Sequence, residues 1–388
     1  MRSLALLLCP FAFTTGAFVF AGLLTPISEE LAVSLGAAAA LQAIFALTCA
    51  LAGPFLAYFT RSIAPRTLIL TILATMVVLN GASSIAPSFS NLFILRLLTG
   101  GIGSIALPLA TTLAVMNGRP EERAKSVALV YAGIPLALIL GIPAGSLIGD
   151  MFGWRASFGL AAAFCAMAWL FVFLFVPPVK ALGNVASTGK GLGALAPSLY
   201  IYFAITFISS AAFFTLVGLI GPTVRLLTGF SSGGVAAIQL LAGISALIGI
   251  RGAAKLSSFG APYKVPAYFA LMILALLVIV PSLSWHRAET VGLIVTVISV
   301  LAGPASQFAI GLTMQTQIAQ SVSREATLAF SVNTSFTYLG QGLGIILGGV
   351  AADLWGIERA PLMGIALAAI GLLLSLTLRH SRTQPAVV

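Results

Sequence analysis

The stretch GIPAGSLIGDMFG at residues 141–153 returns 203 residues later as GIILGGVAADLWG at residues 344–356. The two stretches share Gly, Ile, Gly, Asp and Gly at matching positions, and Glu122 meets Glu325 at the same offset. Because 203 is close to half of the 388 residues, we interpret the chain as two copies of one unit. Duplicated halves of this kind are typical of membrane proteins that transport solutes.

The composition places the chain in a membrane. Hydrophobic residues make up 60% and charged residues 7% of the chain, and the mean hydropathy is +1.11. A soluble domain carries roughly 25% charged residues, and a helix needs about 20 apolar residues to cross a bilayer. The expected fold is all-α, an integral membrane protein with twelve transmembrane helices in two pseudo-symmetric six-helix bundles. The apolar segments lie near 4–25, 35–58, 67–86, 92–115, 125–149, 156–178, 197–220, 232–254, 265–284, 290–318, 327–352 and 360–378.

The longest polar connection lies near the middle of the chain. Residues 179–196 are rich in Gly, Ser and Lys, which predicts a cytoplasmic linker between an N-terminal six-helix half (1–178) and a C-terminal one (197–388). If the N-terminus is cytoplasmic, 14 of the 19 Lys and Arg residues lie on the inner side and 4 on the outer side. This positive-inside bias predicts a multi-pass protein of the cell (inner) membrane with both termini cytoplasmic.

The reactive side chains exclude several classes of function. Cys9, Cys49 and Cys165 lie inside apolar segments and are interpreted as buried hydrophobic residues. With two histidines in the whole chain, neither a His/Cys metal site nor any other cofactor is expected. An enzyme would need paired carboxylates or a nucleophile with its base at membrane depth, and the sequence has neither, so no catalytic residue is proposed. The P-loop pattern is also missing, which argues against transport driven by ATP.

The net charge of +10 does not indicate a nucleic-acid partner. The basic residues are dispersed among the loops and form no block of Lys and Arg. The short loops and tail argue against a receptor or scaffold with an extra folded region. The expected partners are a small-molecule substrate, protons and the lipid bilayer. A two-half bundle needs no second copy to make a pathway, so a monomer is expected.

Several motifs resemble the major facilitator superfamily, in the order in which that family carries them. Gly53, Arg61 and Arg66 resemble its gated loop after the second helix. Residues 96–100 (RLLTG) resemble its Arg-x-x-x-Gly motif, which is thought to assist proton transfer. Residues 141–145, followed by Gly153-Trp154-Arg155, resemble the drug/proton antiporter branch and particularly its arabinose- and sugar-efflux-permease-like members.

This resemblance implies secondary active transport by alternating access, with proton-coupled efflux of small drug-like or sugar-like molecules. It implies a cytoplasmic gate at Gly53, Arg61 and Arg66. It also implies a proton-coupling or conformational role for a second set, which comprises Arg96, Gly100, Gly141, Pro143 and Gly145.

Two departures from the family pattern leave an alternative open. Thr60 stands where the loop motif often carries an Asp, and residues 14–18 lack the helix-1 carboxylate of many drug antiporters. No Asp or Glu lies at mid-depth in any predicted helix. The alternative is a facilitator, or a carrier coupled to another ion, in which Arg96 is structural.

Arg96 is the single cation predicted inside the membrane. An arginine at the centre of a bilayer costs roughly 2.5–3.5 kcal/mol on insertion scales. We expect it to face the interior of the bundle and to bind a backbone carbonyl or a polar side chain of helix 1 or 2. The alternative is an arginine that snorkels to the outer interface.

Glycines recur every fourth residue, at Gly141, Gly145 and Gly149 and again at Gly340, Gly344 and Gly348. Small residues at this spacing let two helices approach closely. Plain close packing is one interpretation. The other is a bending or sliding seam, marked by Pro143, where helices 5 and 11 meet the opposite half. The matched Asp150 and Asp353 are interpreted as interfacial charges, or alternatively as a symmetric outer gate.

Polar and aromatic side chains inside otherwise apolar spans are candidates for a substrate cavity, because a buried amide in lipid must find a partner or line water. The resemblance implies that helices 1, 4, 7 and 10 line this cavity. The candidates contain aromatics and amides rather than charges, which favours a neutral or weakly charged, amphipathic or polyol-like substrate. They are Phe13, Thr14, Phe18, Tyr131, Tyr202, Thr206, Phe213, Gln307, Asn333 and Gln341.

Overall fold

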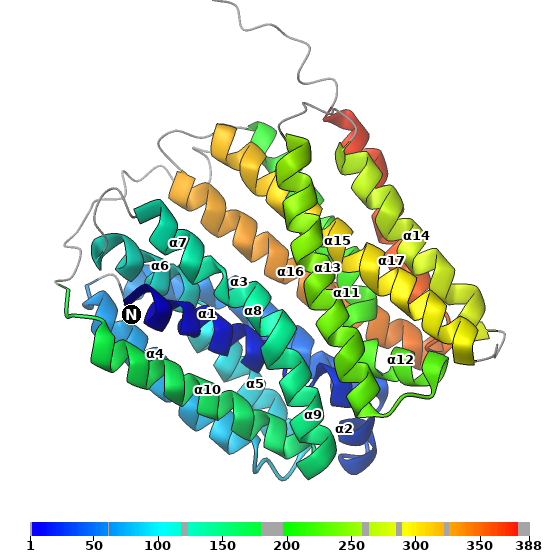
Figure 1. The fold of residues 1–388 in the computed structure, drawn as a ribbon, viewed down its shortest axis with the longest axis horizontal. Coiled ribbons are helices and arrows are strands. Elements are labelled where there is room, and N and C mark those ends of the chain that lie inside the picture. Colours follow the sequence, from blue (N-terminus) through cyan, green and yellow to red (C-terminus); the bar gives the residue numbers. More distant parts are fainter. Residues whose placement is uncertain are drawn as a thin grey trace, which may run out of the picture. The chain divides into compact units, whose positions relative to one another are not determined.

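The computed structural model describes residues 2–60, 62–117, 123–179, 197–257, 264–284, 289–321 and 326–378. Every secondary-structure element in these ranges is helical, and Figure 1 labels the elements along the chain. Within these ranges, twelve helices are long and apolar enough to cross a membrane. The predicted all-α class and number of spans are therefore confirmed.

The first six spans are built from short and long helical pieces. Helix 1 comprises α1, η1 and α2, helix 4 comprises α5 and α6, and helix 5 comprises α7, α8, η3 and α9. The pieces are α1 (Arg2–Phe18), η1 (Ala21–Leu23), α2 (Leu24–Glu30), α3 (Leu35–Phe59), α4 (Pro65–Ser83), α5 (Phe89–Gly103), α6 (Ala106–Asn117), α7 (Arg123–Tyr131), α8 (Gly133–Leu136), η3 (Ala137–Gly141), α9 (Ile142–Phe152) and α10 (Trp154–Phe175).

The last six spans are less interrupted. Helix 7 comprises α11 and α12, and each of helices 8 to 12 is a single element. The pieces are α11 (Pro197–Val217), α12 (Ile220–Thr228), α13 (Ser232–Ser257), α14 (Lys264–Ser284), α15 (Glu289–Ser321), α16 (Ala326–Trp355) and α17 (Ala360–Thr377).

The repeated stretch of the sequence ends helices 5 and 11 in the same way. Gly153 has φ +86° and Gly356 has φ +89°, a backbone conformation that favours glycine over residues with a side chain. Gly153 separates α9 from α10, and Gly356 lies between α16 and α17. The matching glycines of the two sequence copies therefore end their helices in the same backbone conformation, which supports an internal duplication.

The two copies of this stretch differ in structure near Pro143. Pro143 follows a π-helical turn, η3, whereas its counterpart Ile346 lies inside α16, which runs without a break. Proline has no N–H to donate and its ring displaces the preceding turn, which is a recognised cause of such local irregularity. Helix 5 is thus locally irregular just before Pro143, where helix 11 is continuous; that this position bends or slides stays a prediction.

The chain divides into two compact units. The first unit holds residues 1–190 together with 230–243, and the second holds 191–229 together with 244–388. The beginning of α13 belongs to the first unit because it packs on helix 5, where Ser146 Oγ donates to Gln239 Oε1 at 2.7 Å. The predicted linker lies almost wholly outside the described residues, so the predicted boundary between the halves stays a prediction.

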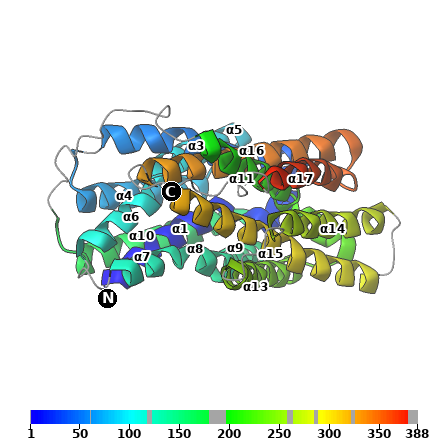
Figure 2. The same ribbon diagram turned by 90° about the horizontal axis from the view of Figure 1, so that it is seen from above.

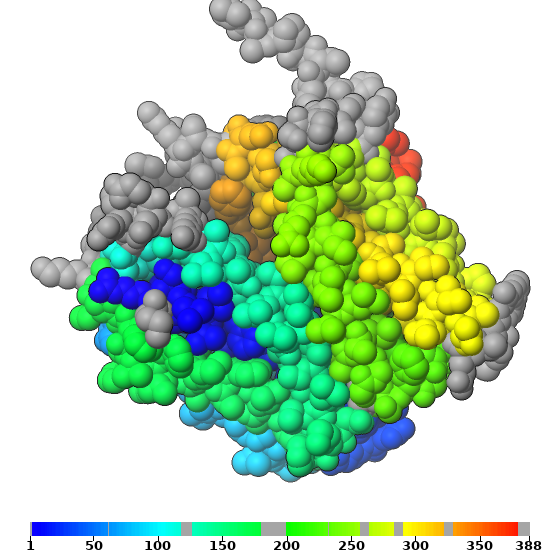
Figure 3. All heavy atoms as spheres, in the orientation of Figure 1, coloured from blue at the N-terminus to red at the C-terminus, as the bar shows by residue number. Residues whose placement is uncertain are grey.

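Each unit has a buried core. In the first unit, α1 packs against α10 and against α7 and α8, and Figure 3 shows its blue atoms bordered by these green and teal helices. In the second unit, α14 and α17 run side by side although they are distant in sequence, as both Figure 1 and Figure 2 show. Their contact contains Phe269, Met272, Leu276 and Ala368, all fully or almost fully buried.

Candidate functional site

Helix 1 is broken inside the membrane. Its first piece, α1, ends at Phe18, and its second long piece, α2, begins at Leu24. Between them the N–H of Leu23 donates to the Phe20 carbonyl at 2.8 Å. The last carbonyls of a helix have no partner within it, and at membrane depth water does not replace that partner. The break therefore requires hydrogen-bond donors from elsewhere in the protein.

Arg96 of α5 supplies those donors. Its Nη1 donates to the Gly16 carbonyl at 2.9 Å and its Nη2 donates to the Ala17 carbonyl at 3.1 Å. The side chain is 0% exposed, so it does not snorkel to an interface, and that interpretation is wrong. A cation at the C-terminal end of a helix also interacts favourably with the helix dipole. The expectation of a backbone partner in helix 1 is confirmed.

Aromatic rings surround the guanidinium group of Arg96. Its central carbon lies 4.5 Å from the ring centroid of Phe45, 5.1 Å from that of Phe20 and 5.7 Å from that of Phe158. Ring faces attract cations, and more strongly where water is excluded. The charge of Arg96 is therefore balanced by carbonyl dipoles and ring faces.

Gly100, one turn beyond Arg96, lets α5 approach α3 closely enough to build this arrangement. A Cβ atom at Gly100 would overlap the carbonyl oxygen of Phe45 and the hydroxyl of Thr48. Cys49 on α3 donates its thiol proton to the Gly100 carbonyl, with 3.2 Å between sulfur and oxygen. Gly100 therefore has a packing role that positions Phe45 beside Arg96.

Asn80 of α4 approaches the helix 1 break from another side. A Cβ atom at Gly16 would lie 3.8 Å from both amide atoms of Asn80. Asn80 is 0% exposed, and its Nδ2 donates to the Met76 carbonyl at 2.8 Å while its Oδ1 has no hydrogen-bond partner. The break thus lies among polar groups from α4 and α5 in an otherwise apolar core.

Helix 7 is broken in the same way. Leu219, which precedes α12, has φ −120° and ψ 16°, and Leu23, which precedes α2, has φ −119° and ψ 17°. The N–H of Leu219 donates to the Leu216 carbonyl at 2.9 Å. Sequence reasoning missed this second repeat, which places a shared Gly-Leu-x-x-Pro pattern 196 residues apart at residues 22–26 and 218–222.

The carbonyl of α11 that matches Gly16 lies before the last turn of α11 and is bonded within its own helix. Ala212 matches Gly16 at the 196-residue offset, and its carbonyl accepts from Thr215 Oγ1 of the same helix at 2.8 Å. The matching carbonyl in helix 1 accepts from Arg96 of another helix. The two breaks therefore share a backbone conformation and differ in what the carbonyls at matching positions bind.

The glycine ladders pack helices within each unit. Cβ atoms at Gly141, Gly145 and Gly149 would overlap atoms of Thr15, Val19 and Leu23 in helix 1. Cβ atoms at Gly340, Gly344 and Gly348 would overlap the carbonyl oxygens of Phe207, Ala211 and Thr215 in helix 7. The six glycines themselves lie against helix 1 or helix 7 of their own half, whereas helix 5 meets helix 8 through other residues, among them Ser146 and Gln239. Close packing is the interpretation that the contacts support.

Buried polar side chains lie along α11 in the second unit, on α11 itself and on its neighbours α15 and α16. Gln307 Nε2 of α15 donates to Ser210 Oγ of α11 at 3.1 Å, and Thr206 lies one turn from Ser210. Asn333 of α16 lies three residues before Phe336, whose ring packs on Phe203 and Phe207 of α11, so Asn333 shares the face turned to α11.

This cluster, which we call the amide cluster (Thr206, Ser210, Gln307 and Asn333), is buried and incompletely bonded. Thr206, Gln307 and Asn333 are 3%, 8% and 4% exposed. Thr206 Oγ1, Gln307 Oε1 and Asn333 Oδ1 have no hydrogen-bond partner in the structure. Gln307 and Thr206, both predicted for the substrate cavity, therefore lie within one turn of each other at Ser210, whereas Asn333 lies further along α11, near the level of Phe203.

A model of the Major Facilitator Superfamily matches residues 6–344 of the chain. The chain belongs to the major facilitator superfamily. It is 28% identical to the inner membrane transport protein YdhP of Escherichia coli (strain K12) over 388 residues, which covers 99% of the chain and 97% of that protein. It is 25% identical to the uncharacterized MFS-type transporter YtbD of Bacillus subtilis (strain 168) over 363 residues, covering 93% and 91% of the two chains.

Solved structures of the superfamily share the fold. A crystal structure of a bacterial homologue of the human lysosomal transporter Spinster, inward-facing and unoccupied, has a TM-score of 0.78 at 17% identity and covers 99% of this chain and 98% of that one. The nucleoside transporter NupG has a TM-score of 0.75 at 14% identity, with 99% and 100% covered. The chain is thus a multi-pass membrane transporter rather than an enzyme, a secondary transporter that moves a small molecule by alternating access.

The family's loop motif is only partly visible. Arg61 lies outside the described residues. Gly53 lies on α3, where an added Cβ would be 3.7 Å from Ser104. Arg66 donates from Nε to the Val176 carbonyl at 2.6 Å and from Nη2 to the Phe173 carbonyl at 2.8 Å, at the C-terminal end of α10. Arg66 therefore caps a helix of its own unit.

The remaining candidates for the substrate cavity are scattered. Phe13 packs on Phe45 and against Gly103 in the core of the first unit, and Phe213 and Tyr202 pack at the edge of the core of the second. The others differ in exposure: Thr14 and Phe18 are half-buried, Tyr131 is 46% exposed and Gln341 is 5% exposed. A hollow of about 360 Å³ between α3 and α5 is lined by apolar residues and Thr48, and none of the candidates lines it.

Proposed function

We propose that the chain is a secondary transporter that exports small, neutral or weakly charged organic molecules, drug-like or sugar-like, in exchange for protons. The substrate class rests on the amide cluster, which contains amides and hydroxyls and no charged side chain. Burying a polar group without a hydrogen bond costs about 1–3 kcal/mol. A substrate hydroxyl or amine that donates to Gln307 Oε1 or Asn333 Oδ1 would recover that cost.

Proton coupling is supported by the resemblance of residues 96–100 to the family's Arg-x-x-x-Gly motif. The same resemblance supports placing the chain in the drug/proton antiporter branch beside the sugar-efflux permeases. The described carboxylates all lie at or near helix ends, for example Glu30, Asp150 and Asp353. The hydrogen bonds of Arg96 to the helix 1 break favour the second candidate, a facilitator or a carrier coupled to another ion, in which Arg96 is structural.

Export is proposed from the resemblance of residues 141–145 to efflux permeases, and the topology defines what export means here. The positive-inside bias of the sequence supports cytoplasmic termini in a bacterial inner membrane, as in the relative named an inner membrane transport protein. A single chain with two six-helix halves supports a monomeric transporter. Export in this topology moves the substrate away from the side that holds the termini.

Transport in everted membrane vesicles tests the coupling. A panel of hydrophobic drugs and sugars is offered under an imposed pH gradient, with and without a protonophore. Proton-coupled export predicts uptake into everted vesicles that collapses when the protonophore is added. Uptake that survives the protonophore would replace the first candidate by the facilitator or by another coupling ion.

Substitution in the amide cluster tests the substrate class. Asn333→Leu replaces the amide by an apolar side chain of similar size. We expect a loss of about tenfold in the uptake of a hydroxyl-rich substrate. Thr334→Val, on the next residue of α16, is the matched control, because Thr334 bonds only to its own helix at Phe330. Equal uptake by the two variants would remove Asn333 from the substrate site.

A further inference from the structure

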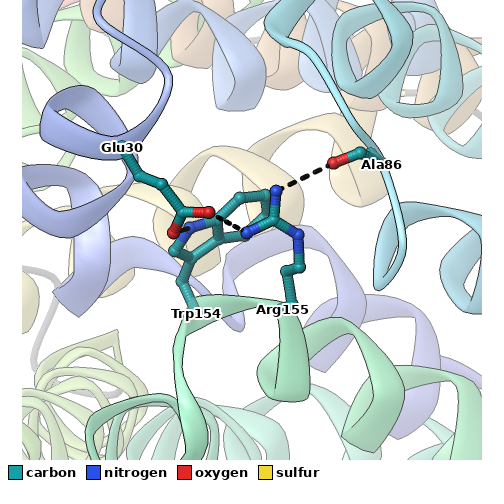
Figure 4. A network of polar contacts seen from close by, with 4 residues as sticks. All are labelled: Glu30, Ala86, Trp154 and Arg155. Atoms are coloured by element: carbon teal, nitrogen blue, oxygen red, sulfur yellow. Dashed lines mark hydrogen bonds and ion pairs between the residues drawn. The ribbon is translucent and has the colours of Figure 1, made fainter.

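The end of helix 1 that is extracellular in the proposed topology is hydrogen-bonded to the start of helix 6. Glu30, the last residue of α2, accepts a hydrogen bond from Trp154 Nε1 at 2.7 Å and forms an ion pair with Arg155. Both partners lie at the start of α10, and Figure 4 shows the Glu30 carboxylate between them. A carboxylate shared by an indole and a guanidinium group has a fixed position, because two donors on one rigid helix turn define it.

The same arginine reaches a third element. Arg155 Nη2 donates to the Ala86 carbonyl at 3.1 Å, in the connection between α4 and α5, as Figure 4 shows. The Arg155 guanidinium stacks on Trp154 with 4.3 Å between its central carbon and the ring. One network therefore joins the outer end of helix 1, the start of helix 6 and the connection between helices 3 and 4.

This outer network continues to the buried arginine. Trp154 is 2% exposed and packs edge-on against Phe158, with 6.0 Å between ring centroids. Phe158 in turn packs on Phe20 and lies 5.7 Å from the Arg96 guanidinium carbon. Arg96 thus binds the end of α1 at the break and Arg155 binds the end of α2, and the rings of Phe158 and Trp154 connect the two arginines.

The second half carries different residues at the matching positions. Leu226 stands at the place of Glu30, 196 residues on, and Ile357 and Glu358 stand at the places of Trp154 and Arg155, 203 residues on. Helix 7 has the same break and the same kind of second piece, α12, without this set of side chains. This particular set of side chains is therefore a feature of the first half.

We propose that Glu30, Trp154 and Arg155 are positioning residues that make α2 move with the first unit as one body during transport. Exposed ion pairs add little to global stability, and the Glu30 and Arg155 side chains are 52% and 33% exposed. The effect of the network is therefore on the position and mobility of α2. This inference does not depend on the substrate or the coupling ion.

Hydrogen–deuterium exchange of the full-length protein in lipid nanodiscs tests the proposal. We expect Glu30→Gln to speed exchange in residues 24–31 by about fivefold and to leave residues 220–228 of helix 7 unchanged. Glu29→Gln is the matched control, since it removes the same charge one residue earlier and should leave both segments unchanged. Raised salt should speed exchange of 24–31 in the native protein and have no effect in Glu30→Gln, because it screens the pair.

A charge swap keeps the test decisive if single variants fold poorly. Glu30→Arg combined with Arg155→Glu rebuilds an opposite-charge pair and should return exchange in 24–31 most of the way to the native rate. A merely structural role for a bulky side chain would show neither the salt dependence nor this rescue. Exchange in Glu30→Gln equal to that in Glu29→Gln, or a swap no better than its single components, would overturn the proposal.

Discussion

Helix 1 and helix 7 break at matching positions, with nearly the same backbone angles at Leu23 and Leu219 and a proline at the third position of α2 and of α12. They differ in what the carbonyls at matching positions bind. Gly16 and Ala17 accept from Arg96 of helix 4, whereas Ala212 accepts from Thr215 of its own helix. The two copies thus have the same backbone shape. In helix 1 the carbonyls accept hydrogen bonds from a neighbouring helix, and in helix 7 the matching carbonyl accepts one from its own helix.

The difference extends to the surroundings. Arg96 lies among Phe20, Phe45 and Phe158. Phe20 is matched by Leu216 at the 196-residue offset and Phe158 by Pro361 at the 203-residue offset. The first half has therefore kept or gained a complete site for a buried cation, and its break depends on one long-range residue. Substitutions at the two breaks should show that dependence directly.

The largest effect is expected from Arg96→Met. Both carbonyls at the helix 1 break would lose their donors at membrane depth, and each unsatisfied group costs about 1–3 kcal/mol. We expect a loss of several kcal/mol in the free energy of unfolding and little folded protein in the membrane. Thermal unfolding of the purified variant in detergent measures this.

Arg96→Lys sharpens the same prediction. Lysine keeps the charge but has a single ammonium group in place of the planar fork that reaches two carbonyls. We expect a stability between those of the native protein and Arg96→Met. A lysine variant as stable as the native protein would show that charge alone, without the paired hydrogen bonds, maintains the break.

The next effect concerns the glycine seams, which are alike in the two halves. A Cβ at Gly145 would overlap the Val19 carbonyl oxygen, and one at Gly348 would overlap that of Thr215. Overpacking of this kind typically costs 1–3 kcal/mol, so we expect both Gly145→Ala and Gly348→Ala to lower the unfolding temperature.

Gly159→Ala is the control for the seams. Gly159 lies in α10 with no atom within 4 Å of an added Cβ, and alanine favours a helix over glycine by about 1 kcal/mol. We expect Gly159→Ala to be neutral or slightly stabilising. If the two seam variants behaved like this control, the ladders would not be close-packing seams.

A smaller effect is expected from Arg66→Ala. Arg66 satisfies the Phe173 and Val176 carbonyls at the exposed C-terminal end of α10, where water can replace it in part. We expect faster hydrogen exchange confined to the last turn of α10 and a loss of about 1 kcal/mol. Arg2→Ala is the control: Arg2 is the first residue of α1 in the same unit, and its removal should leave hydrogen exchange in the last turn of α10 unchanged.

Much of this fold could be predicted from local patterns. The apolar runs predicted the number of spans. A helix that crosses a membrane forms all its backbone hydrogen bonds internally, and its length is visible as a run of about 20 apolar residues. The 203-residue repeat predicted a duplication, and the matching glycines Gly153 and Gly356 have the same backbone conformation. Arg96 was predicted to face inward, because a cation in lipid needs a partner.

The partners themselves could not be predicted, because they depend on packing between distant segments. The break in helix 1 leaves no gap in hydrophobicity, so the need for Arg96 at Gly16 and Ala17 was invisible. A search for repeats at several offsets would have found Gly-Leu-x-x-Pro at residues 22–26 and 218–222. That the glycine ladders face their own unit likewise depends on the rotation of whole helices.

The smallest effect is expected from Thr215→Val, and it completes the comparison of the two breaks. Valine keeps the shape of threonine and removes only the hydroxyl that donates to the Ala212 carbonyl. The expected loss is about 1 kcal/mol, the usual net worth of one hydrogen bond, measured by thermal unfolding beside Arg96→Met. If Thr215→Val were as damaging as Arg96→Met, both breaks would depend on their donors equally, and the asymmetry between the halves would lie in residue type alone. A small loss of stability in Thr215→Val would mean that the break in helix 7 is stabilised by its backbone and packing. Only the break in helix 1 would then depend on a single charged side chain.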